Sequence, residues 1–240
     1  MKRLAIIPAR AGSKGVPGKN LRAINGVSLL ARAVLTARAT GLFDRIFVST
    51  DSADYAAEAE RFGADVPWLR PPELASDTAL VADAMRHTLD EFAHRGEHFD
   101  TLALLEPTSP LRTPEIVRET VLAAEAEGWD AAFTVSEVPK PYHALKQFRL
   151  DESGAAHFVM PEASPNVNRQ SLYPTFIRNG LAYAVRVPAF LRTHSIHGRR
   201  ARAIVVDEEV VSIDTEEDFR LAERLIAERG DPLAGFIERG

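Results

Sequence analysis

Short apolar runs alternate with amphipathic stretches along most of the chain. Residues 4–7 form an unbroken apolar run that stops at a loop, which is typical of a strand buried on both faces in a parallel sheet. Apolar residues then recur at helical spacing over residues 29–37 and stop before Gly41, a residue suited to ending a helix. The pattern therefore predicts a strand, a loop and a helix as the first unit of the fold.

The same alternation continues toward the C-terminus. Further strands are predicted over residues 46–50, 101–105, 131–136, 181–187 and 203–206, and further helices over residues 53–62, 79–95, 114–128 and 216–228. Repeated strand–helix–strand units with short connections favour a mostly parallel sheet covered by helices on both faces. We predict an α/β fold in which residues 1–240 form a single domain.

The alternation is interrupted between residues 138 and 178. This stretch has no long helical period and contains five prolines, at positions 139, 141, 161, 165 and 174. It is too long and irregular for an ordinary connection in a compact domain. We predict an inserted excursion of short strands and loops that projects from the sheet.

Composition removes several classes of function. The net charge of −5 argues against a general nucleic-acid or anionic-membrane surface, and the absence of cysteine excludes disulfides, thiolate metal sites and cysteine nucleophiles. No apolar run approaches the ~20 residues of a membrane span, and Pro8 and Arg10 end the first run too early for a signal peptide. We expect a cytoplasmic protein. The seven histidines form no metal-binding pair at helical spacing and are interpreted as surface residues.

The loop after the first strand carries the clearest chemical signal. Residues 8–20 contain three glycines, three cations and a hydroxyl, which suit a phosphate chain because bare backbone N–H groups and positive charge both favour it. The glycines at 12, 15 and 18 fit neither the Rossmann dinucleotide spacing nor the P-loop spacing. An ordinary solvated glycine loop is the alternative.

Five motifs in order together resemble one family. Residues 7–20 (IPARAGSKGVPGKN) and 105–112 (LEPTSPLR) resemble the first two motifs of the CMP-sialic acid synthetases, the acylneuraminate cytidylyltransferases. The order continues through Arg169-Gln170, the Asn-Gly-x-x-Tyr of residues 179–183 and the Ile-Asp-Thr-x-x-Asp-Phe of residues 213–219. The resemblance spans nearly the whole chain.

This resemblance implies a Rossmann-like nucleotidyltransferase fold, here a single cytidylyltransferase domain. The enzyme would transfer CMP from CTP to a nonulosonic (sialic-type) acid and release pyrophosphate with Mg²⁺. The catalytic residues implied are Arg10, Lys19 and Asp214, with Asp214 also the metal ligand. The implied nucleotide-binding residues are Arg10, Gly12, Ser13, Lys14, Lys19, Asn20 and Arg70. The implied substrate-binding residues are Glu106, Thr108, Ser109, Arg169, Gln170, Asn179 and Tyr183.

The chain departs from the family pattern at three places. Glu106 replaces the usual glutamine, Ile177 stands where an arginine is common with Arg178 next to it, and Ser212 stands where a second aspartate is frequent. Thr215 and Asp218 have the spacing of a helix capping box, which leaves Asp214 at a strand end. Two alternatives therefore stay open: a nucleotidyltransferase for another sugar acid or a sugar phosphate, and a noncatalytic nucleotide-binding relative. The sequence does not name the sugar.

The resemblance also implies a homodimer. The excursion over residues 138–178 would form the dimer interface, and Arg169 would reach the neighbouring subunit's site. The apolar residues expected to face the partner are Phe148, Phe158, Val159, Leu172 and Phe176.

Overall fold

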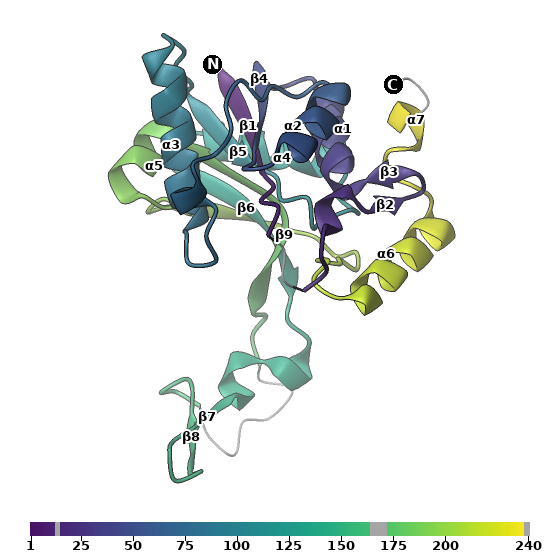
Figure 1. The fold of residues 1–240 in the computed structure, drawn as a ribbon. Coiled ribbons are helices and arrows are strands. Elements are labelled where there is room, and N and C mark those ends of the chain that lie inside the picture. Colours follow the sequence, from purple (N-terminus) through teal and green to yellow (C-terminus); the bar gives the residue numbers. More distant parts are fainter. Residues whose placement is uncertain (13–14, 164–171, 238–240) are drawn as a thin grey trace.

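A twisted sheet forms the centre of the molecule (Figure 1). The computed structural model describes residues 1–12, 15–163 and 172–237. Within these residues the main sheet has six strands in the order β10-β6-β9-β5-β1-β4. They are β1 (Arg3–Pro8), β4 (Arg45–Ser49), β5 (Thr101–Leu104), β6 (Ala131–Glu137), β9 (Phe176–Arg186) and β10 (Ala201–Val205). Because β1 pairs in parallel with β4 and β5, and β10 with β6, the predicted mostly parallel sheet is confirmed.

Helices cover both faces of this sheet (Figure 1). One face carries α1 (Leu29–Thr40), α2 (Ala53–Arg61) and α4 (Pro114–Glu125), and the other carries α3 (Val81–His94) and α5 (Val187–Thr193). Along β1, Ala5 and Ile7 belong to the core on the first face, whereas Leu4 and Ile6 belong to the core on the second. The run is apolar at every position because both faces of β1 are buried, as predicted from the sequence.

The helix ends follow local sequence signals. Ser28 accepts a hydrogen bond from the Ala31 N–H at the start of α1, and Gly41 ends that helix with a φ of 62°. Thr113 caps α4 in the same way, with Pro114 as the first helical residue. α6 (Glu216–Arg229) begins with the predicted capping box between Thr215 and Asp218.

Strand β9 differs from the other strands because it runs antiparallel to both β5 and β6. The chain leaves the sheet at the end of β6 and returns to the same edge, so the returning strand must run in the opposite direction. The β6–β9 register is irregular: Phe133 faces Tyr183, but Val135 faces Arg178. β9 has extra residues at this point, and they include Asn179 and Gly180. The first two residues of the predicted Asn-Gly-x-x-Tyr motif therefore lie outside the regular pairing of the two strands.

The chain between β6 and β9 projects beyond the carboxyl ends of the parallel strands (Figure 1). Its described part contains two 3₁₀ turns (Lys140–Tyr142 and Ala144–Lys146) and the hairpin β7 (Phe148–Leu150) and β8 (Ala156–Phe158). The predicted short strands and loops are therefore present. β9 already begins at Phe176, inside the stretch predicted as the excursion.

Two residues of this region, His143 and Leu172, are more buried than predicted from the sequence. His143 is buried, not a surface residue: its Nε2 lies 2.9 Å from the Tyr173 carbonyl oxygen, and its Nδ1 accepts from the Leu145 N–H at 3.1 Å. Leu172 is also buried within the chain itself, so it does not belong to the exposed apolar surface expected of the excursion. Local hydrogen bonding and packing, which spacing alone does not reveal, enclose both side chains.

The remaining small elements were not predicted. A hairpin of β2 (Ala23–Ile24) and β3 (Val27–Ser28) turns at Asn25-Gly26, a known hairpin signal, but its two-residue strands are too short to show periodicity. A short α7 (Ala234–Ile237) follows α6. α6 itself packs against Val16 and Ile213, which places it beside the first loop. In the part of the chain that the structure covers, no helix is long and apolar enough to cross a membrane.

Candidate active site

The loops after β1, β5 and β10 meet at one end of the sheet and enclose a pocket of about 290 Å³. Parallel strands bring their carboxyl ends to the same edge, where open α/β sheets bind ligands. The pocket is lined by Pro8, Arg10, Gly15, Lys19, Asn20, Glu106, Pro107, Thr108 and Asp214. The fold thus unites predicted nucleotide, substrate and metal residues from three distant segments.

Lys19 and Asp214 form an ion pair across this pocket. The Lys19 Nζ lies 2.9 Å from Asp214 Oδ1 and donates to the Ile213 carbonyl oxygen at 2.8 Å. The Lys19 side chain is 13% exposed, whereas the Asp214 side chain is 72% exposed. The carboxylate is therefore positioned by a nearly buried cation and remains open to a ligand.

Gly15 explains why the first loop can approach Asp214 so closely. A Cβ atom at this position would lie 2.4 Å from the Asp214 carbonyl oxygen, which no side chain tolerates. Gly12, in contrast, has open space around it. The glycine at position 15 is thus required by contact between two protein segments, in addition to any contact with phosphate.

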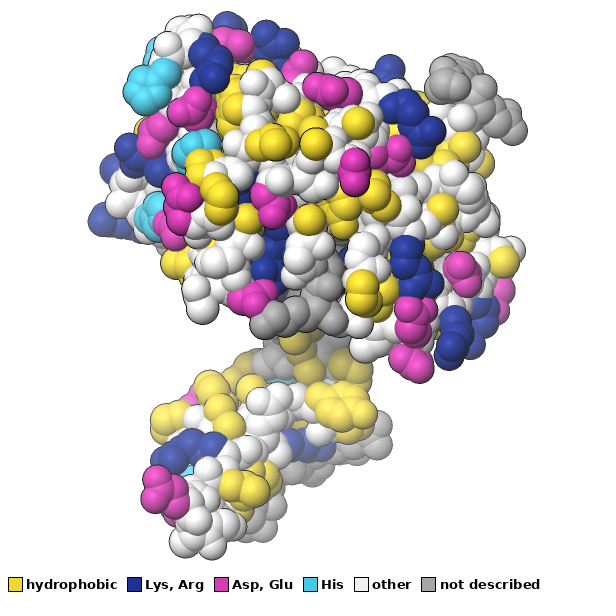
Figure 2. All heavy atoms as spheres, viewed as in Figure 1, with side chains coloured by type: hydrophobic (Ala, Val, Ile, Leu, Met, Phe, Trp, Pro, Cys, Tyr) yellow, Lys and Arg dark blue, Asp and Glu magenta, His cyan; other side chains and the backbone are white. Residues whose placement is uncertain are grey.

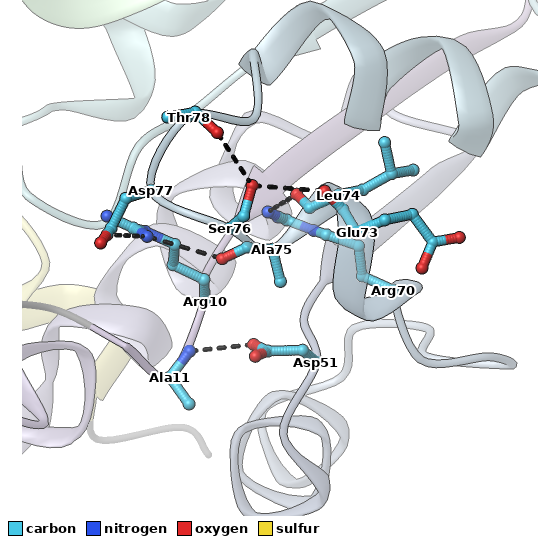
Figure 3. A network of polar contacts seen from close by, with 10 residues as sticks. All are labelled: Arg10, Ala11, Asp51, Arg70, Glu73, Leu74, Ala75, Ser76, Asp77 and Thr78. Carbon is cyan, nitrogen blue, oxygen red and sulfur yellow. Dashed lines mark hydrogen bonds and ion pairs between the residues drawn. The ribbon is translucent and has the colours of Figure 1, made fainter.

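Two aspartates accept hydrogen bonds from donor groups at the start of the loop after β1 (Figure 3). The Arg10 Nη1 donates to Asp77 Oδ1 at 2.6 Å and lies 3.5 Å from the Ala75 carbonyl oxygen. The adjacent Ala11 N–H donates to Asp51 Oδ1 at 2.9 Å. Asp51 and Asp77 were not singled out from the sequence, because isolated aspartates in loops carry no distinctive pattern. In this structure the two aspartates accept hydrogen bonds from the Arg10 guanidinium and the Ala11 N–H, donors of the kind that was expected to bind phosphate.

Arg70 lies in the same network but supports the protein backbone (Figure 3). Its guanidinium donates to Ser49 Oγ at 2.9 Å, to the Ser49 carbonyl oxygen at 2.6 Å and to the Leu74 carbonyl oxygen at 3.4 Å. Burial lowers the pKa of Arg70, and repulsion from Arg10 acts in the same direction. Arg70 therefore fixes the segment that carries Ala75 and Asp77 beside Arg10, and it does not line the pocket.

The second motif is held against β9 by Arg112 and Ser109. The fully buried Arg112 guanidinium donates to the carbonyl oxygens of Glu106 (2.6 Å), Gly180 (3.5 Å) and Leu181. Burial lowers the pKa of Arg112 to about 10. The Ser109 Oγ donates to the Gly180 carbonyl oxygen at 2.9 Å. These contacts make the loop rigid and place Glu106 and Thr108 at the pocket.

Asn179 and Tyr183 lie on β9, next to the pocket but not among its lining residues. The Asn179 Nδ2 donates to Ser136 Oγ at 3.0 Å, and its Oδ1 accepts from the Leu181 N–H at 3.3 Å. Burial raises the pKa of Tyr183, and the nearby carboxyl of Glu106 raises it further. Tyr183 therefore lies near Glu106, whereas Asn179 lines a separate pocket together with Ser136, Arg178 and Ser212.

Arg178 and His197 form a pair on the β9 side of the site, and this pair was not predicted from the sequence. The Arg178 Nη1 lies 2.6 Å from His197 Nε2, and the His197 ring packs against Phe133 and Tyr183. Burial and the Arg178 charge lower the pKa of His197, which favours a neutral imidazole that accepts from Arg178. One residue lies on β9 and the other in the loop after α5, so no short motif connects them.

Four predicted site residues lie outside the described residues: Ser13, Lys14, Arg169 and Gln170. In residues 1–12, 15–163 and 172–237, no three His, Cys, Asp or Glu side chains are grouped so that they could hold a metal ion by themselves. With Asp214 as the only carboxylate assigned to it, a metal would need further ligands from the bound nucleotide and water.

Comparison with known proteins gives a consistent result. The sequence profile of a family described as cytidylyltransferase matches residues 4–235. The chain is 34% identical over 233 residues to a CMP-N,N'-diacetyllegionaminic acid synthase of Legionella pneumophila, covering 94% of this chain and 97% of that protein. It is 34% identical over 223 residues to an N-acylneuraminate cytidylyltransferase of Escherichia coli, covering 92% of this chain but only 51% of that relative.

Solved structures share the fold. CMP:2-keto-3-deoxy-manno-octonic acid synthetase in complex with CTP superposes with a TM-score of 0.71 at 18% identity, covering 95% of this chain and 99% of that one. 4-Diphosphocytidyl-2C-methyl-D-erythritol synthase of Anaerococcus prevotii gives a TM-score of 0.66 at 13% identity, covering 94% and 98%. The predicted Rossmann-like nucleotidyltransferase architecture is therefore confirmed.

Proposed function

Because this chain belongs to the cytidylyltransferase family, we propose that it transfers CMP from CTP to a nonulosonic acid and releases pyrophosphate. The observation that carries the proposal is the pocket in which Arg10, Lys19 and Asp214 meet. Cations at a pocket of this kind stabilise the charge that develops on pyrophosphate as it leaves. The two sequence relatives named above supply the substrate class, since one is named as the synthase of a CMP-linked acid and the other as a cytidylyltransferase of an acylneuraminate.

Lys19 and Arg10 are the proposed phosphate contacts. Both side chains line the pocket, and Asn20 lies buried beside Lys19 on the short turn Lys19–Leu21. A triphosphate carries about four negative charges, so a protein of net charge −5 needs local cations to hold it. Attack by the anomeric hydroxyl of the acid on the α-phosphorus forms the new P–O bond, and the bond to pyrophosphate breaks.

Mg²⁺ is the proposed metal, and the residues present fit it with a single carboxylate. Asp214 is exposed at the pocket and would bind the ion, while phosphate oxygens and water would complete the coordination, as Mg²⁺ commonly prefers. When bound, the ion supplies positive charge to the phosphates. Lys19 holds the Asp214 carboxylate in place, and Gly15 lies close against the Asp214 carbonyl oxygen.

We expect Asp77 to compete with CTP for Arg10. The Arg10–Asp77 pair is partly exposed, with 34% and 44% of the two side chains accessible, so breaking it costs about 1 kcal/mol or less. Asp77→Asn should therefore tighten CTP binding by about two- to five-fold in isothermal titration calorimetry. Glu73→Gln removes an exposed carboxylate of the same segment and serves as the matched control. Weaker binding by Asp77→Asn would instead place Asp77 on the nucleotide.

A homodimer formed through the excursion is also proposed. Exposed apolar side chains gather on this part of the molecule (Figure 2), including Phe148, Leu150, Val159, Phe176 and Ile177. Phe148 and Phe158 pack against each other across the β7–β8 hairpin, with ring centroids 4.5 Å apart. An apolar surface of this kind, on a segment that projects from the sheet, is typical of a protein interface.

Light scattering at micromolar concentration should give twice the mass of the chain, which is 26.4 kDa. Replacing Phe148 and Leu150 with Ser should shift the protein toward the monomer, because it removes apolar area from the expected interface. The matched double variant Leu69→Ser and Leu80→Ser changes exposed apolar residues outside the excursion and should leave the mass unchanged. A wild-type protein that stays monomeric contradicts the dimer.

The enzymatic proposal is tested by pyrophosphate release. Purified protein is incubated with CTP, Mg²⁺ and a panel of sialic-, legionaminic- and pseudaminic-type acids, with sugar phosphates as a second panel. Release with at least one of the acids, together with a CMP-linked product in mass spectrometry, supports the proposal. Release only with sugar phosphates identifies a different acceptor class, and CTP binding without any release identifies a noncatalytic relative.

A further inference from the structure

Strand β10 forms one edge of the main sheet, and its only strand partner among the described residues is β6. The Arg200 carbonyl oxygen and the Val206 N–H, at the two ends of β10, form hydrogen bonds to residues of β6. Because backbone groups of successive residues in a strand point to opposite sides, those of the residues between alternate in direction. The groups that point away from β6 belong to Ala201, Ala203 and Val205. In the part of the chain that the structure covers, no backbone hydrogen bond uses them.

The opposite edge of the sheet, β4, is covered by the segment that follows α2. The Asp65 N–H donates to the Ile46 carbonyl oxygen at 2.7 Å, and the Asp65 carbonyl oxygen accepts from the Val48 N–H at 3.2 Å. Further along, the Arg70 N–H donates to the Thr50 carbonyl oxygen at 2.6 Å. Proteins commonly cover or interrupt edge strands because a free edge pairs with other chains. Among the described residues this chain covers its β4 edge and leaves the β10 edge open.

The side chains of β10 allow another strand to approach. Ala203 and Val205 are both exposed, and half of the Val205 side chain is accessible at 50%. Proline, which would prevent a strand from pairing on this side, is absent from residues 189–231. The apolar centre of this edge therefore favours the addition of a strand.

The charges around β10 determine which strand fits. Residues 199–209 read RRARAIVVDEE, so arginines gather at one end of the apolar centre and carboxylates at the other. Arg202, Asp207 and Glu208 are exposed and form no ion pair with any residue that the structure describes. A strand that complements this edge along its whole length has the same charge pattern in the opposite direction.

A second copy of β10, running antiparallel to the first, has this pattern. When Ile204 of one copy lies opposite Ile204 of the other, Arg200 lies opposite Glu208 at both ends of the contact. Ala203 then lies opposite Val205, and their outward backbone groups are directed at each other. A parallel arrangement in the same register would instead place arginines beside arginines. Charge thus selects the antiparallel pair.

We propose that the β10 edge is an interface with a second copy of this chain, in which two β10 strands pair antiparallel and join two sheets into one. The contact is isologous, since the same surface is used by both copies. It is separate from the excursion, which projects beyond the carboxyl ends of the parallel strands (Figure 1). Because each copy contributes one short strand, we expect association at protein concentrations above those of the excursion dimer and at low salt.

Two charge-reversed double variants test this interface. Asp207→Lys with Glu208→Lys makes the edge basic, and Arg199→Glu with Arg202→Glu makes it acidic. Arg200 stays unchanged because its guanidinium packs on a tryptophan ring of the same chain. Each double variant repels its own copies, whereas a basic edge and an acidic edge complement each other.

The matched controls carry the same changes in charge on exposed residues away from β10. Glu60→Lys with Glu73→Lys reproduces the charge of the basic variant. Arg220→Glu with Arg224→Glu, on α6, reproduces that of the acidic variant. Thermal unfolding of all four double variants shows whether each keeps the stability of the wild type.

Sedimentation velocity at low ionic strength measures the weight-average mass between about 10 µM and about 500 µM protein. The mass of the wild type and of both controls should rise by at least about 1.5-fold over this range, and that of each charge-reversed variant alone by less than about 1.1-fold. An equimolar mixture of the basic and acidic variants should rise like the wild type. Added NaCl should reduce the rise in the wild type.

Three results would overturn the interface: a wild-type mass that does not change with concentration, a charge-reversed variant that associates as strongly as the wild type, or a mixture that does not associate. Recovery in the mixture also shows that both components are folded, since each then supplies an intact edge. The measurement involves neither CTP nor a sugar acid. Its outcome is therefore independent of the proposed enzymatic function.

Discussion

Lys19→Met is expected to weaken CTP binding by about 30- to 100-fold. The ammonium group of Lys19 is nearly buried at the pocket and is aimed at Asp214, so it is positioned without a large loss of side-chain freedom when phosphate binds. Removing a charged donor of this kind costs roughly 2–2.7 kcal/mol, which corresponds to that loss in affinity. Isothermal titration calorimetry with CTP, with and without Mg²⁺, measures the effect.

The control for this variant is Lys2→Met. Lys2 precedes β1, at the end of the strand opposite the first loop, and its side chain is exposed. Removing it changes the net charge by the same amount, so any loss of affinity from the overall field of the protein appears in both variants. Thermal unfolding of Lys19→Met shows how far the lost hydrogen bond to the Ile213 carbonyl oxygen destabilises the fold. Equal CTP affinities for the two variants would contradict the assignment of Lys19 to phosphate.

The architecture of the sheet could be predicted because its strands show their burial in the sequence. β1 has apolar residues on both faces, and α1 and α6 begin and end at residues whose local hydrogen bonding is nearly independent of the rest of the fold. Those signals act over a few residues, so one sequence reveals them. The antiparallel direction of β9 depends instead on where the excursion returns to the sheet, and that path has no local signature.

The sequence singled out residues that lie together at the pocket, but it did not reveal most of their contacts. Lys19 and Asp214 are 195 positions apart, and their proximity follows from the shared edge of the parallel strands. The sequence does not reveal that Gly15 is required by the Asp214 backbone, or that Asp77 holds Arg10. Both contacts join segments whose distance in space is set by the whole fold. The motif residues were therefore identifiable, whereas their partners were not.

Asp214→Asn is expected to reduce turnover to less than a tenth of the wild-type rate while CTP affinity stays within about three-fold. Asn keeps the size of the side chain but removes the charge that Mg²⁺ needs, and the described residues contain no group of three metal-binding side chains that could replace it. Lys19 and Arg10, the cations proposed to hold the phosphates, are unchanged in this variant. A ten-fold loss in kcat corresponds to about 1.4 kcal/mol of transition-state stabilisation.

The substitution should leave the fold intact because the structural role of this segment uses other atoms. The Asp214 backbone N–H, which Asn retains, donates to Asp218 Oδ2, and the capping box of α6 is formed by Thr215 and Asp218. Glu217→Gln removes an exposed carboxylate nearby and is the matched control. Steady-state rates over a series of Mg²⁺ concentrations separate a metal role from a structural one, since only loss of a metal ligand raises the concentration needed for half-maximal activity. If Asp214→Asn keeps more than a tenth of the wild-type activity at the same Mg²⁺ requirement, its carboxylate is not the metal ligand and the segment serves mainly to begin α6.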